Sequence, residues 1–521
     1  MTTTAEPLLP PTRASLYDRW LGRLAADPVL ARRWGWLAPL LVTALAGILR
    51  LWNLGHPHEL VFDETYYVKD AWSQWNLGYP ATWPEGADER FEAGETDIFD
   101  TAGSFVVHPP LGKWLIGLGM WVFGADSSFG WRVSVAVFGT ATVLVLYCVA
   151  KALSGSIAFA SIASGLLAID GLAIVMSRVA ILDIFVAFFT LVTFWFVLLD
   201  RRSHIARLEA GILARTVDDT PPNWGPLLWN RPWIVAAGLA AGATTAVKWS
   251  GLYVIVAVGL YLVVTDALTR RRAGVVMWPL DGLRQGLAAA VLAVPAALAV
   301  YLASWTGWLV TSAGYGRGTA ATLGDSLASL WKYHEAMYGF HVGLTSAHSY
   351  ASPAWQWPLL VRPTSMFYHS DELGEAGCAA ANGCVQNIYS MPNPLIWYAA
   401  VAACIYLAWR FVVARDWRHA FVLTGIAATY VPWLLYPERT IFQFYTVAIL
   451  PFMLLALAFA LRDIASGAPG SSATRRMSGQ RVVLVFLAFA VVLSAFWYPV
   501  LTATPVPYDF WRLHNWLQSW V

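Results

Sequence analysis

Charged residues are scarce in this chain. Lys, Arg, Asp and Glu make up 13% of its 521 residues, whereas 58% are hydrophobic. A soluble globular protein usually carries about a quarter of its residues as charged side chains. So low a fraction excludes a surface that faces water over most of its area and indicates a membrane protein. The net charge of +2 gives no support for a nucleic-acid partner, and none is predicted.

Cysteine is also rare, with four residues in the whole chain. Cys148 and Cys404 lie inside apolar runs, whereas Cys378 and Cys384 lie six positions apart in a polar loop. We predict a disulfide between the latter two, which requires an oxidising side of a membrane.

A cleavable signal peptide is not evident. Residues 1–35 are polar, contain five arginines and lead directly into a long apolar run. This pattern is typical of a cytoplasmic tail before a signal-anchor span. We therefore divide the chain into a cytoplasmic tail (1–35) and a transmembrane domain (36–521).

Long apolar runs dominate the rest of the chain. A run of roughly 17–25 apolar residues is a candidate membrane-spanning helix. The 29 Trp and 21 Tyr agree with this, because amphipathic rings collect at membrane–water interfaces. The predicted fold is an all-α polytopic membrane protein with about eleven spans, near 36–54, 132–150, 156–176, 183–199, 233–249, 251–268, 285–304, 394–412, 419–436, 440–461 and 482–501.

The distribution of charge predicts the orientation of these spans. If the N-terminus is cytoplasmic, the cytoplasmic segments hold 22 of the 34 Lys and Arg residues, as the positive-inside rule requires. The loop 55–131 then lies outside, with twelve acidic residues against three basic ones. The second large external loop is 305–393, and the C-terminus is external. We expect the protein in the cell membrane, in contact with membrane lipids.

One short apolar segment, residues 111–124, could reverse this orientation. It is about 14 residues long, which is short for a crossing. A crossing here would place Arg270, Arg271 and Arg272 outside. We therefore predict a helix that lies in the external interface.

Adjacent carboxylates follow the first predicted span. Asp63 and Glu64 are flanked by aromatic residues, as expected of a base site at a membrane surface. They point in different directions on any regular backbone, so at most one acts as the base. The alternative is a solvated acidic loop.

Cationic side chains lie near the predicted external ends of the spans. Charges near the hydrocarbon layer are costly and often functional. Here they suit a bound anion, such as a lipid phosphate in the outer leaflet. Two of these cations have a structural alternative to anion binding. Lys113 would extend from an interfacial helix toward water, and Arg178 would form a structural ion pair with Asp183. The other cations of this set are Arg50, Arg132, Lys248 and Arg439.

Three histidines are spaced seven apart in the second external loop, at His334, His341 and His348. This spacing could place them on one helix face as metal ligands. Gly339, Gly343 and Pro353 argue against one long helix, so hydrogen-bonding histidines in a substrate groove are the preferred interpretation. No metal or other cofactor is predicted.

With these residues in place, the chain resembles the protein O-mannosyltransferase family of the glycosyltransferase-C fold. The resemblance extends from about residue 36 to residue 510. Each single motif is weak evidence for the family, but the order of the motifs along the chain is specific. The motifs are Arg50-Leu51, Phe62-Asp63-Glu64, His108-Pro109-Pro110-Leu111-Gly112-Lys113, Trp131-Arg132, Ser177-Arg178 with Leu182-Asp183, Lys248-Trp249-Ser250-Gly251-Leu252, His341 and His348 before Trp357-Pro358-Leu359, and Pro437-Glu438-Arg439.

The resemblance implies transfer of mannose from a polyprenyl- or dolichyl-phosphate carrier to Ser or Thr hydroxyls of exported proteins. It implies that Asp63 is the catalytic base. Eukaryotic members carry a β-trefoil domain between the seventh and eighth spans. Here that loop has only about 88 residues (305–392), as in a bacterial form, which leaves acceptor recognition open.

The mechanism expected from these residues needs a base and positive charge on the departing phosphate. Asp63 would be the base, with Glu64 orienting the site, and direct displacement would invert the anomeric carbon. Lys113, Arg178 and Arg439 are the phosphate candidates. Arg50 and Arg132 would hold the Asp63–Glu64 loop. The supporting residues are His108, Asp183, Lys248, His341 and His348.

Two other functions stay open from the sequence. The first is a lipid-phosphate glycosyltransferase of the same fold that acts on a glycolipid. The second is a lipid-sugar transporter, which the small number of mid-depth charges in the spans disfavours.

Overall fold

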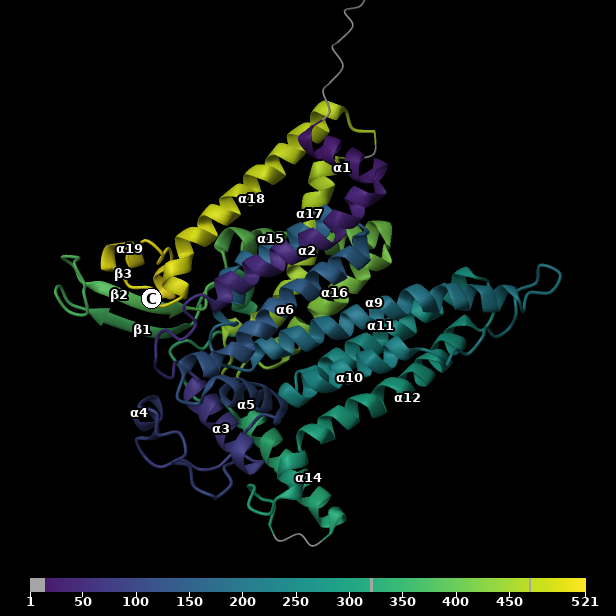
Figure 1. Cartoon of the computed structure of the whole chain (residues 1–521). Coiled ribbons are helices and arrows are strands. Elements are labelled where there is room, and N and C mark those ends of the chain that lie inside the picture. The colour runs from purple at the N-terminus through teal and green to yellow at the C-terminus, as the bar shows by residue number, and fades with distance from the viewer. Residues whose placement is uncertain (1–14, 319–321, 468–469) are drawn as a thin grey trace, which may run out of the picture.

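The computed structural model describes residues 15–318, 322–467 and 470–521. They form a bundle of long helices, with shorter elements gathered at one end (Figure 1). Seven of the described helices are long and apolar enough to cross a membrane. These are α2 (Pro28–Leu51), α6 (Ser128–Ser154), α9 (Asp183–Leu213), α11 (Gly251–Arg272), α12 (Trp278–Ser304), α15 (Pro394–Ala414) and α18 (Ala473–Leu501).

Shorter helices occupy the other four predicted spans. They are α7 (Ile157–Ile169) with α8 (Gly171–Val175), α10 (Pro232–Val247), α16 (Trp417–Tyr430) with η2 (Val431–Leu435), and η3 (Gln443–Ala448) with α17 (Leu450–Ser466). A helix therefore lies on each predicted span, while the number of crossings stays a prediction. The predicted tail is partly helical, because α1 (Leu16–Ala26) and the start of α2 lie within it.

The loop 55–131 contains α3 (Glu64–Leu77), α4 (Ala87–Glu92) and α5 (Leu111–Phe123). Helix α5, the predicted interfacial helix, packs against both α3 and α6. Two glycines allow this close approach. A Cβ atom on Gly117 would lie 3.0 Å from the Ala71 carbonyl oxygen of α3, and one on Gly119 would lie 2.7 Å from the Gly130 carbonyl oxygen of α6. Only glycine fits such gaps without a shift of the neighbouring backbone.

The second large loop contains α13 (Thr306–Val310), α14 (Leu323–Gly343), η1 (Ala354–Leu359) and two strands. Helix α14 continues through Gly339 and ends at Gly343. The expectation that the three histidines do not share one long helix is therefore confirmed. His334 and His341 lie in α14 and His348 follows it, although Gly339 does not interrupt the helix. A single helical glycine costs only about 1 kcal/mol, which packing can offset.

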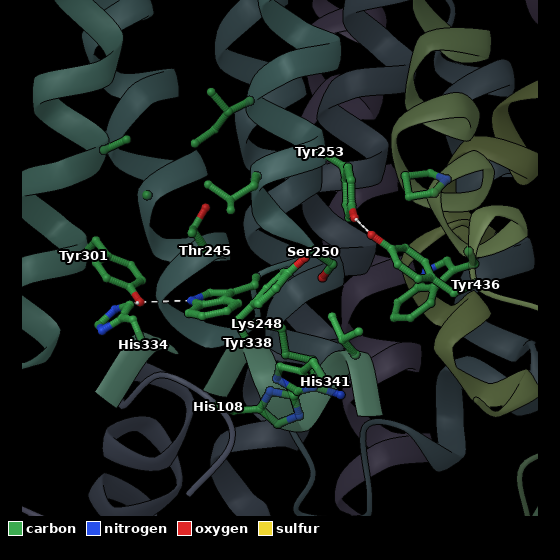
Figure 2. Close-up of a pocket in the computed structure, with 18 of the residues that line it drawn as sticks. His108, Thr245, Lys248, Ser250, Tyr253, Tyr301, His334, Tyr338, His341 and Tyr436 are labelled. Atoms are coloured by element: carbon green, nitrogen blue, oxygen red, sulfur yellow. Dashed lines mark hydrogen bonds between the residues drawn. The ribbon is translucent and has the colours of Figure 1, made fainter. Parts of the chain in front are cut away.

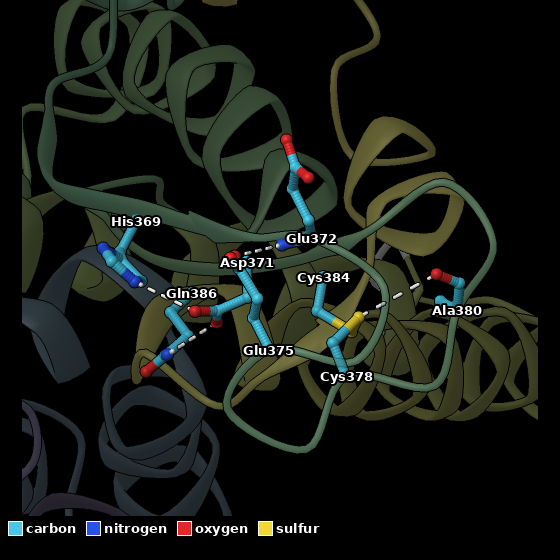
Figure 3. The surroundings of a disulfide bond; sticks show 8 residues. All are labelled: His369, Asp371, Glu372, Glu375, Cys378, Ala380, Cys384 and Gln386. Carbon is cyan, nitrogen blue, oxygen red and sulfur yellow. Dashed lines mark hydrogen bonds and ion pairs between the residues drawn. A yellow bond between two sulfur atoms is a disulfide. The ribbon is translucent and has the colours of Figure 1, made fainter.

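A small sheet, absent from the all-α prediction, lies beside the C-terminal end of α18 (Figure 1). Strands β1 (Ser365–Asp371) and β2 (Cys384–Tyr389) are antiparallel, and β3 (Val506–Pro507) pairs with β2. Figure 3 shows the predicted disulfide Cys378–Cys384, which closes the connection between β1 and β2. The chain ends with α19 (Tyr508–Arg512) and η4 (Gln518–Trp520).

Candidate active site

Asp63 precedes the first turn of α3 as its N-cap residue. An N-cap aspartate usually accepts a hydrogen bond from a backbone N–H of that turn. Here the side chain makes no such bond. In the described part of the chain the Asp63 carboxylate has no hydrogen-bond or ion-pair partner at all. The carboxylate is therefore left available for a ligand.

Phe62, the residue before Asp63, is held in an unusual backbone conformation by its ring contacts. Phe62 adopts a left-handed backbone conformation, with φ of 51°, which is uncommon for a bulky residue. Its ring packs edge-on against the rings of Phe442 and Phe444, with centroids 5.9 and 5.6 Å away. Such strained residues persist only where the surrounding structure holds them.

Burial raises the pKa of Asp63 to about 6. The positive charge of Lys248 lowers this pKa and the negative charge of Asp183 raises it, both by less than burial does. At neutral pH the carboxylate is therefore ionised but more basic than an exposed aspartate, which suits a general base.

Glu64 has a different environment. It is fully buried and forms a two-pronged ion pair with Arg132, with both N···O distances 2.8 Å. It also accepts hydrogen bonds from the backbone N–H groups of Val61 and Ala180. Every one of these bonds joins Glu64 to the protein itself, and through them Glu64 is tied to Arg132, Val61 and Ala180.

Lys248 comes from the short break between α10 and α11, where the predicted turn lies. Its Nζ is 2.8 Å from a carboxylate oxygen of Asp183, and it lies over the Tyr445 ring at 4.9 Å from the centroid. The expected pairing of Arg178 with Asp183 was therefore wrong. Arg178 donates instead to the backbone carbonyls of Arg50, Trp52 and Asn53.

A largely apolar cavity of about 620 Å³ opens beside Lys248, between α10, α11, α12, α14 and η2 (Figure 2). Two cations line it, Lys248 and Arg439. Arg439 donates to the backbone carbonyl of His341 at 3.1 Å and lies beside the Trp433 ring. Lys248 also lines a smaller adjoining cavity together with Asp183 and Tyr445.

Stacked imidazole rings form another part of the cavity wall. His108 stacks on His341 with centroids 5.1 Å apart, and Tyr67 also stacks on His108. Burial lowers the pKa of His341 to about 4 and that of His108 well below its usual value. Both rings are therefore neutral at pH 7, and Lys248 and Arg439 carry the positive charge of this wall.

The other histidines differ in position. His334 also lines the cavity, where its ring bonds to the Tyr301 hydroxyl at 2.6 Å. His348 packs instead against Phe62 and Phe442, beside Asp63. The three histidines therefore do not share one site.

Two of the three predicted phosphate cations lie elsewhere. Lys113 is buried and its Nζ donates to the backbone carbonyl of His108 at 2.8 Å. Arg178 is occupied by the three carbonyls given above. Arg50, predicted to hold the Asp63–Glu64 loop, instead bonds to Ser177 and to the carbonyls of Leu167 and Ala168. Arg50 and Arg178 donate to carbonyls at the C-terminal ends of α7 and α2, which have no partner within their own helices. The order of residues along the chain does not reveal these contacts.

Aromatic residues of the cavity were missed. Tyr253 and Tyr436 share a hydrogen bond of 2.6 Å between their hydroxyls (Figure 2). Trp249 donates to the Tyr301 hydroxyl at 3.0 Å. Trp249 is part of the motif that contains Lys248, and Tyr436 directly precedes the motif that contains Arg439, so both could have been inferred from their place in the sequence.

The fold defines the class of protein. It resembles the Saccharomyces cerevisiae protein O-mannosyltransferase Pmt1–Pmt2 complex bound to its sugar donor, with a TM-score of 0.66 over 93% of this chain and 92% of that one, at 15% identity. ArnT from Cupriavidus metallidurans, bound to undecaprenyl phosphate, gives a TM-score of 0.50 over 90% of this chain and 74% of that one, at 16% identity. The fold is thus the glycosyltransferase-C fold.

The sequence comparisons are more specific. Residues 91–310 match the dolichyl-phosphate-mannose–protein mannosyltransferase family, and residues 326–520 match the C-terminal four-transmembrane region of protein O-mannosyltransferases. Polyprenol-phosphate-mannose–protein mannosyltransferases of Mycolicibacterium smegmatis and Mycobacterium tuberculosis are 34% identical to the chain, over 94% of it and 93–94% of their own length. The chain belongs to the protein O-mannosyltransferase family and is a glycosyltransferase.

Proposed function

We propose that the protein transfers mannose from polyprenyl-phosphate mannose to Ser and Thr hydroxyls of exported proteins, on the external face of the cell membrane. Asp63 is the base and the anomeric carbon is inverted. The reaction includes no metal ion or other cofactor. The N-terminus is cytoplasmic and the C-terminus external.

The observation that carries this proposal is the available carboxylate of Asp63 beside the Lys248–Asp183 pair. A hydroxyl acceptor needs a group that removes its proton as the new bond forms. The carboxylate of Asp63 is uncommitted and has a raised pKa, whereas Glu64 beside it is fully used by Arg132. Of the two adjacent acids, Asp63 is therefore the base.

The cavity suits the lipid-phosphate donor. Its largely apolar wall suits a polyprenyl chain, and Lys248 and Arg439 supply positive charge for the phosphate as it departs. Arg439 keeps the phosphate role predicted from the sequence, and Lys248 takes the role first assigned to Lys113 and Arg178. The nearby Asp183 carboxylate is paired with Lys248, so Asp63 acts as a single base and direct displacement inverts the sugar.

The test is the substitution Asp63→Asn, assayed with polyprenyl-phosphate mannose and a Ser/Thr-rich acceptor peptide. Loss of a general base typically lowers the rate by about 10²–10⁴-fold. We expect a loss of this size with normal membrane insertion and a thermal midpoint no lower than that of the wild type, because the side chain has no partner to lose and burial disfavours its charge.

Asp126→Asn is the matched control, since Asp126 is an exposed aspartate of the same loop. It should retain wild-type transfer. Transfer by Asp63→Asn at the wild-type rate would remove Asp63 from the base role. A product with the donor's anomeric configuration would rule out direct displacement.

A further inference from the structure

A second cavity, of about 360 Å³, lies between α9, α11, α15 and α16, and it is lined by a different set of cations. Helix α11 contributes to both cavities. Its residues 252–255 line the cavity beside Lys248, and residues between 257 and 272 line the second cavity. The second cavity therefore lies toward the opposite end of α11 from Lys248.

Three arginines form the charged rim of this cavity. Arg272 is the last residue of α11, Arg415 caps the C-terminus of α15, and Arg201 belongs to α9. Arg201 lies over the ring of Trp417 at 4.2 Å from its centroid. Within the described residues, none of the three forms an ion pair with a carboxylate.

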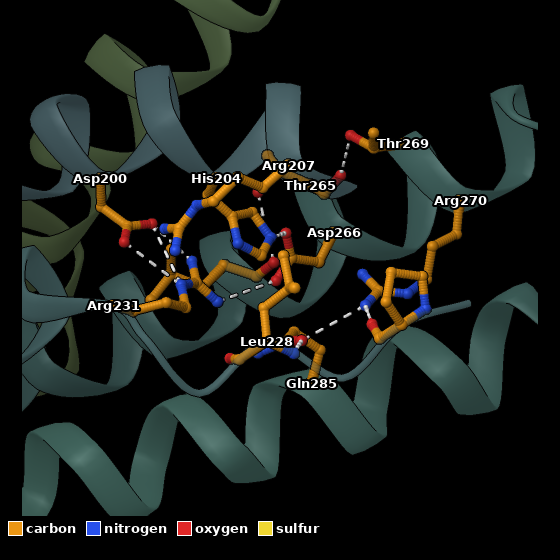
Figure 4. A network of polar contacts seen from close by, with 12 residues as sticks. Asp200, His204, Arg207, Leu228, Arg231, Thr265, Asp266, Thr269, Arg270 and Gln285 are labelled. Carbon is orange, nitrogen blue, oxygen red and sulfur yellow. Dashed lines mark hydrogen bonds and ion pairs between the residues drawn. The ribbon is translucent and has the colours of Figure 1, made fainter. Parts of the chain in front are cut away.

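The arginines next to this cavity differ from the three rim arginines, because they have carboxylate partners. Figure 4 shows a buried network in which Arg231 pairs with Asp200 and Asp266. Arg270, also in that network, pairs with Asp281 at 2.7 Å. Buried arginines are thus matched with carboxylates here, while the three rim arginines are not.

The carboxylates closest to the rim along the chain are already committed. Asp200 and Asp266 pair within the buried network, and Asp266 also bonds to His204. Asp416 caps α16 and pairs with Arg418. The net charge that faces the cavity is therefore positive.

The floor of the cavity is largely apolar and continuous with an exposed apolar surface of α11. Leu260, Val264 and Leu268 line it and belong to a stripe of exposed apolar residues at every fourth position of α11, which begins at Leu252.

Among the polar side chains of the lining, Thr265, Thr269 and Thr424 donate to backbone carbonyls of their own helices. The buried Tyr261 hydroxyl forms no hydrogen bond with any of the described residues, although the Arg201 guanidinium lies near it.

We propose that this cavity binds an anionic phospholipid of the adjacent leaflet. The headgroup phosphate lies among Arg201, Arg272 and Arg415, and one acyl chain lies along the α11–α16 groove. Arginine recognises phosphate by charge-assisted hydrogen bonds, and cations at the level of a lipid headgroup attract anionic lipids. Arg272 and Arg415 lie at the C-terminal ends of α11 and α15, and Arg201 projects from within α9 to the same cavity. The Tyr261 hydroxyl is a donor for an ester or phosphate oxygen. This site is independent of the mannosyl-transfer proposal.

The test compares binding of dioleoylphosphatidylglycerol and dioleoylphosphatidylcholine to the purified full-length protein in detergent, by native mass spectrometry. The wild-type protein should prefer the anionic lipid. A cation beside an anionic lipid is worth about fivefold in affinity, so Arg201→Gln, Arg272→Gln and Arg415→Gln together should weaken its binding at least about tenfold. The triple variant Arg19→Gln, Arg23→Gln and Arg475→Gln removes the same charge from exposed positions elsewhere and should bind normally.

A second pair of variants tests the groove without changing charge. Val264→Trp fills the cavity floor and should lower occupancy by both lipids. Val256→Trp places the same bulk on the same exposed stripe, outside the cavity lining, and should not.

Equal binding of the two lipids by the wild-type protein would overturn the proposal. So would unchanged binding by the rim variant, or equal losses in the two triple variants. Equal losses in the two tryptophan variants would also overturn it. If inorganic phosphate displaced the lipid at equal concentration, the site would bind a free anion rather than a phospholipid.

Discussion

Asp63 combines a partly buried negative charge with the proposed role of general base. A base must be deprotonated before it can accept the hydroxyl proton. Since burial raises the pKa of Asp63 to about 6, its active form is present above that pH and is lost as the pH falls through it.

We therefore expect kcat/KM for mannosyl transfer to fall about tenfold per pH unit below pH 6 and to level off above it. The pH–rate profile of the purified enzyme measures this. Transfer by Asp63→Asn, where measurable, should lack this acidic limb. A wild-type rate independent of pH between 5 and 7 would contradict the assignment.

Glu64 and Arg132 make a second residue-scale prediction, because their ion pair is buried. Glu64→Gln would leave the Arg132 guanidinium without its anion in a site that excludes water. Breaking a buried pair in this way typically costs about 3–5 kcal/mol. We expect a clearly lower thermal midpoint and less folded protein in membranes.

The exposed pair Arg90–Glu95 in the same loop is the control. Both side chains are about half exposed, so Arg90→Gln should cost at most about 1 kcal/mol. Similar midpoints for Glu64→Gln and Arg90→Gln would show that the buried pair does not hold the loop.

At the scale of elements, the site depends on how short segments of helix meet. The break at residues 248–250 ends α10 and starts α11, which brings Lys248 to Asp183. Helix α5 packs against α3, and Asp63 is the N-cap residue that precedes α3. The placement of the base therefore depends on the close packing of α5.

Gly119→Val tests this packing. A side chain at this position would collide with the Gly130 carbonyl oxygen and with Ser134, so α5 would have to move. We expect overpacking to cost about 1–3 kcal/mol and to reduce transfer. Gly165→Ala in α7 is the control, because a Cβ there meets nothing within 4 Å, and it should be neutral or slightly stabilising. Unchanged stability and transfer in Gly119→Val would contradict the role of α5.

At the scale of the whole molecule, the short elements gather at one end of the bundle. Helices α3, α4, α5 and α14 lie together in Figure 1, away from α1. The predicted orientation requires this separation, because it assigns loops 55–131 and 305–393 to one side and residues 1–35 to the other.

Cysteine labelling in a background without the native cysteines tests the orientation. Leu373→Cys lies in the exposed loop after β1 and should react with an impermeant maleimide in intact cells. Val217→Cys, exposed after α9, should react only after the cells are permeabilised. The reverse result would place Asp63 in the cytosol and contradict the proposed function.

Much of this architecture follows from composition and pattern alone. Apolar runs predicted where the long helices lie, because hydrophobic length is a property of the chain itself. Order along the chain also placed Asp63, Glu64, Arg132, Lys248 and Arg439 near the site. The disulfide between Cys378 and Cys384 was predictable because only these two cysteines share a polar loop.

Tertiary structure alone decided which charges meet. Lys248, rather than Arg178, pairs with Asp183, and Lys113 and Arg50 serve backbone carbonyls, because these bonds join segments far apart in the chain. The β1–β2–β3 sheet could not be predicted from the sequence either, since β3 comes more than a hundred residues after β2 and has only two residues. Sequence patterns record how apolar a segment is, whereas the partner of a buried charge depends on which helix ends the fold brings together.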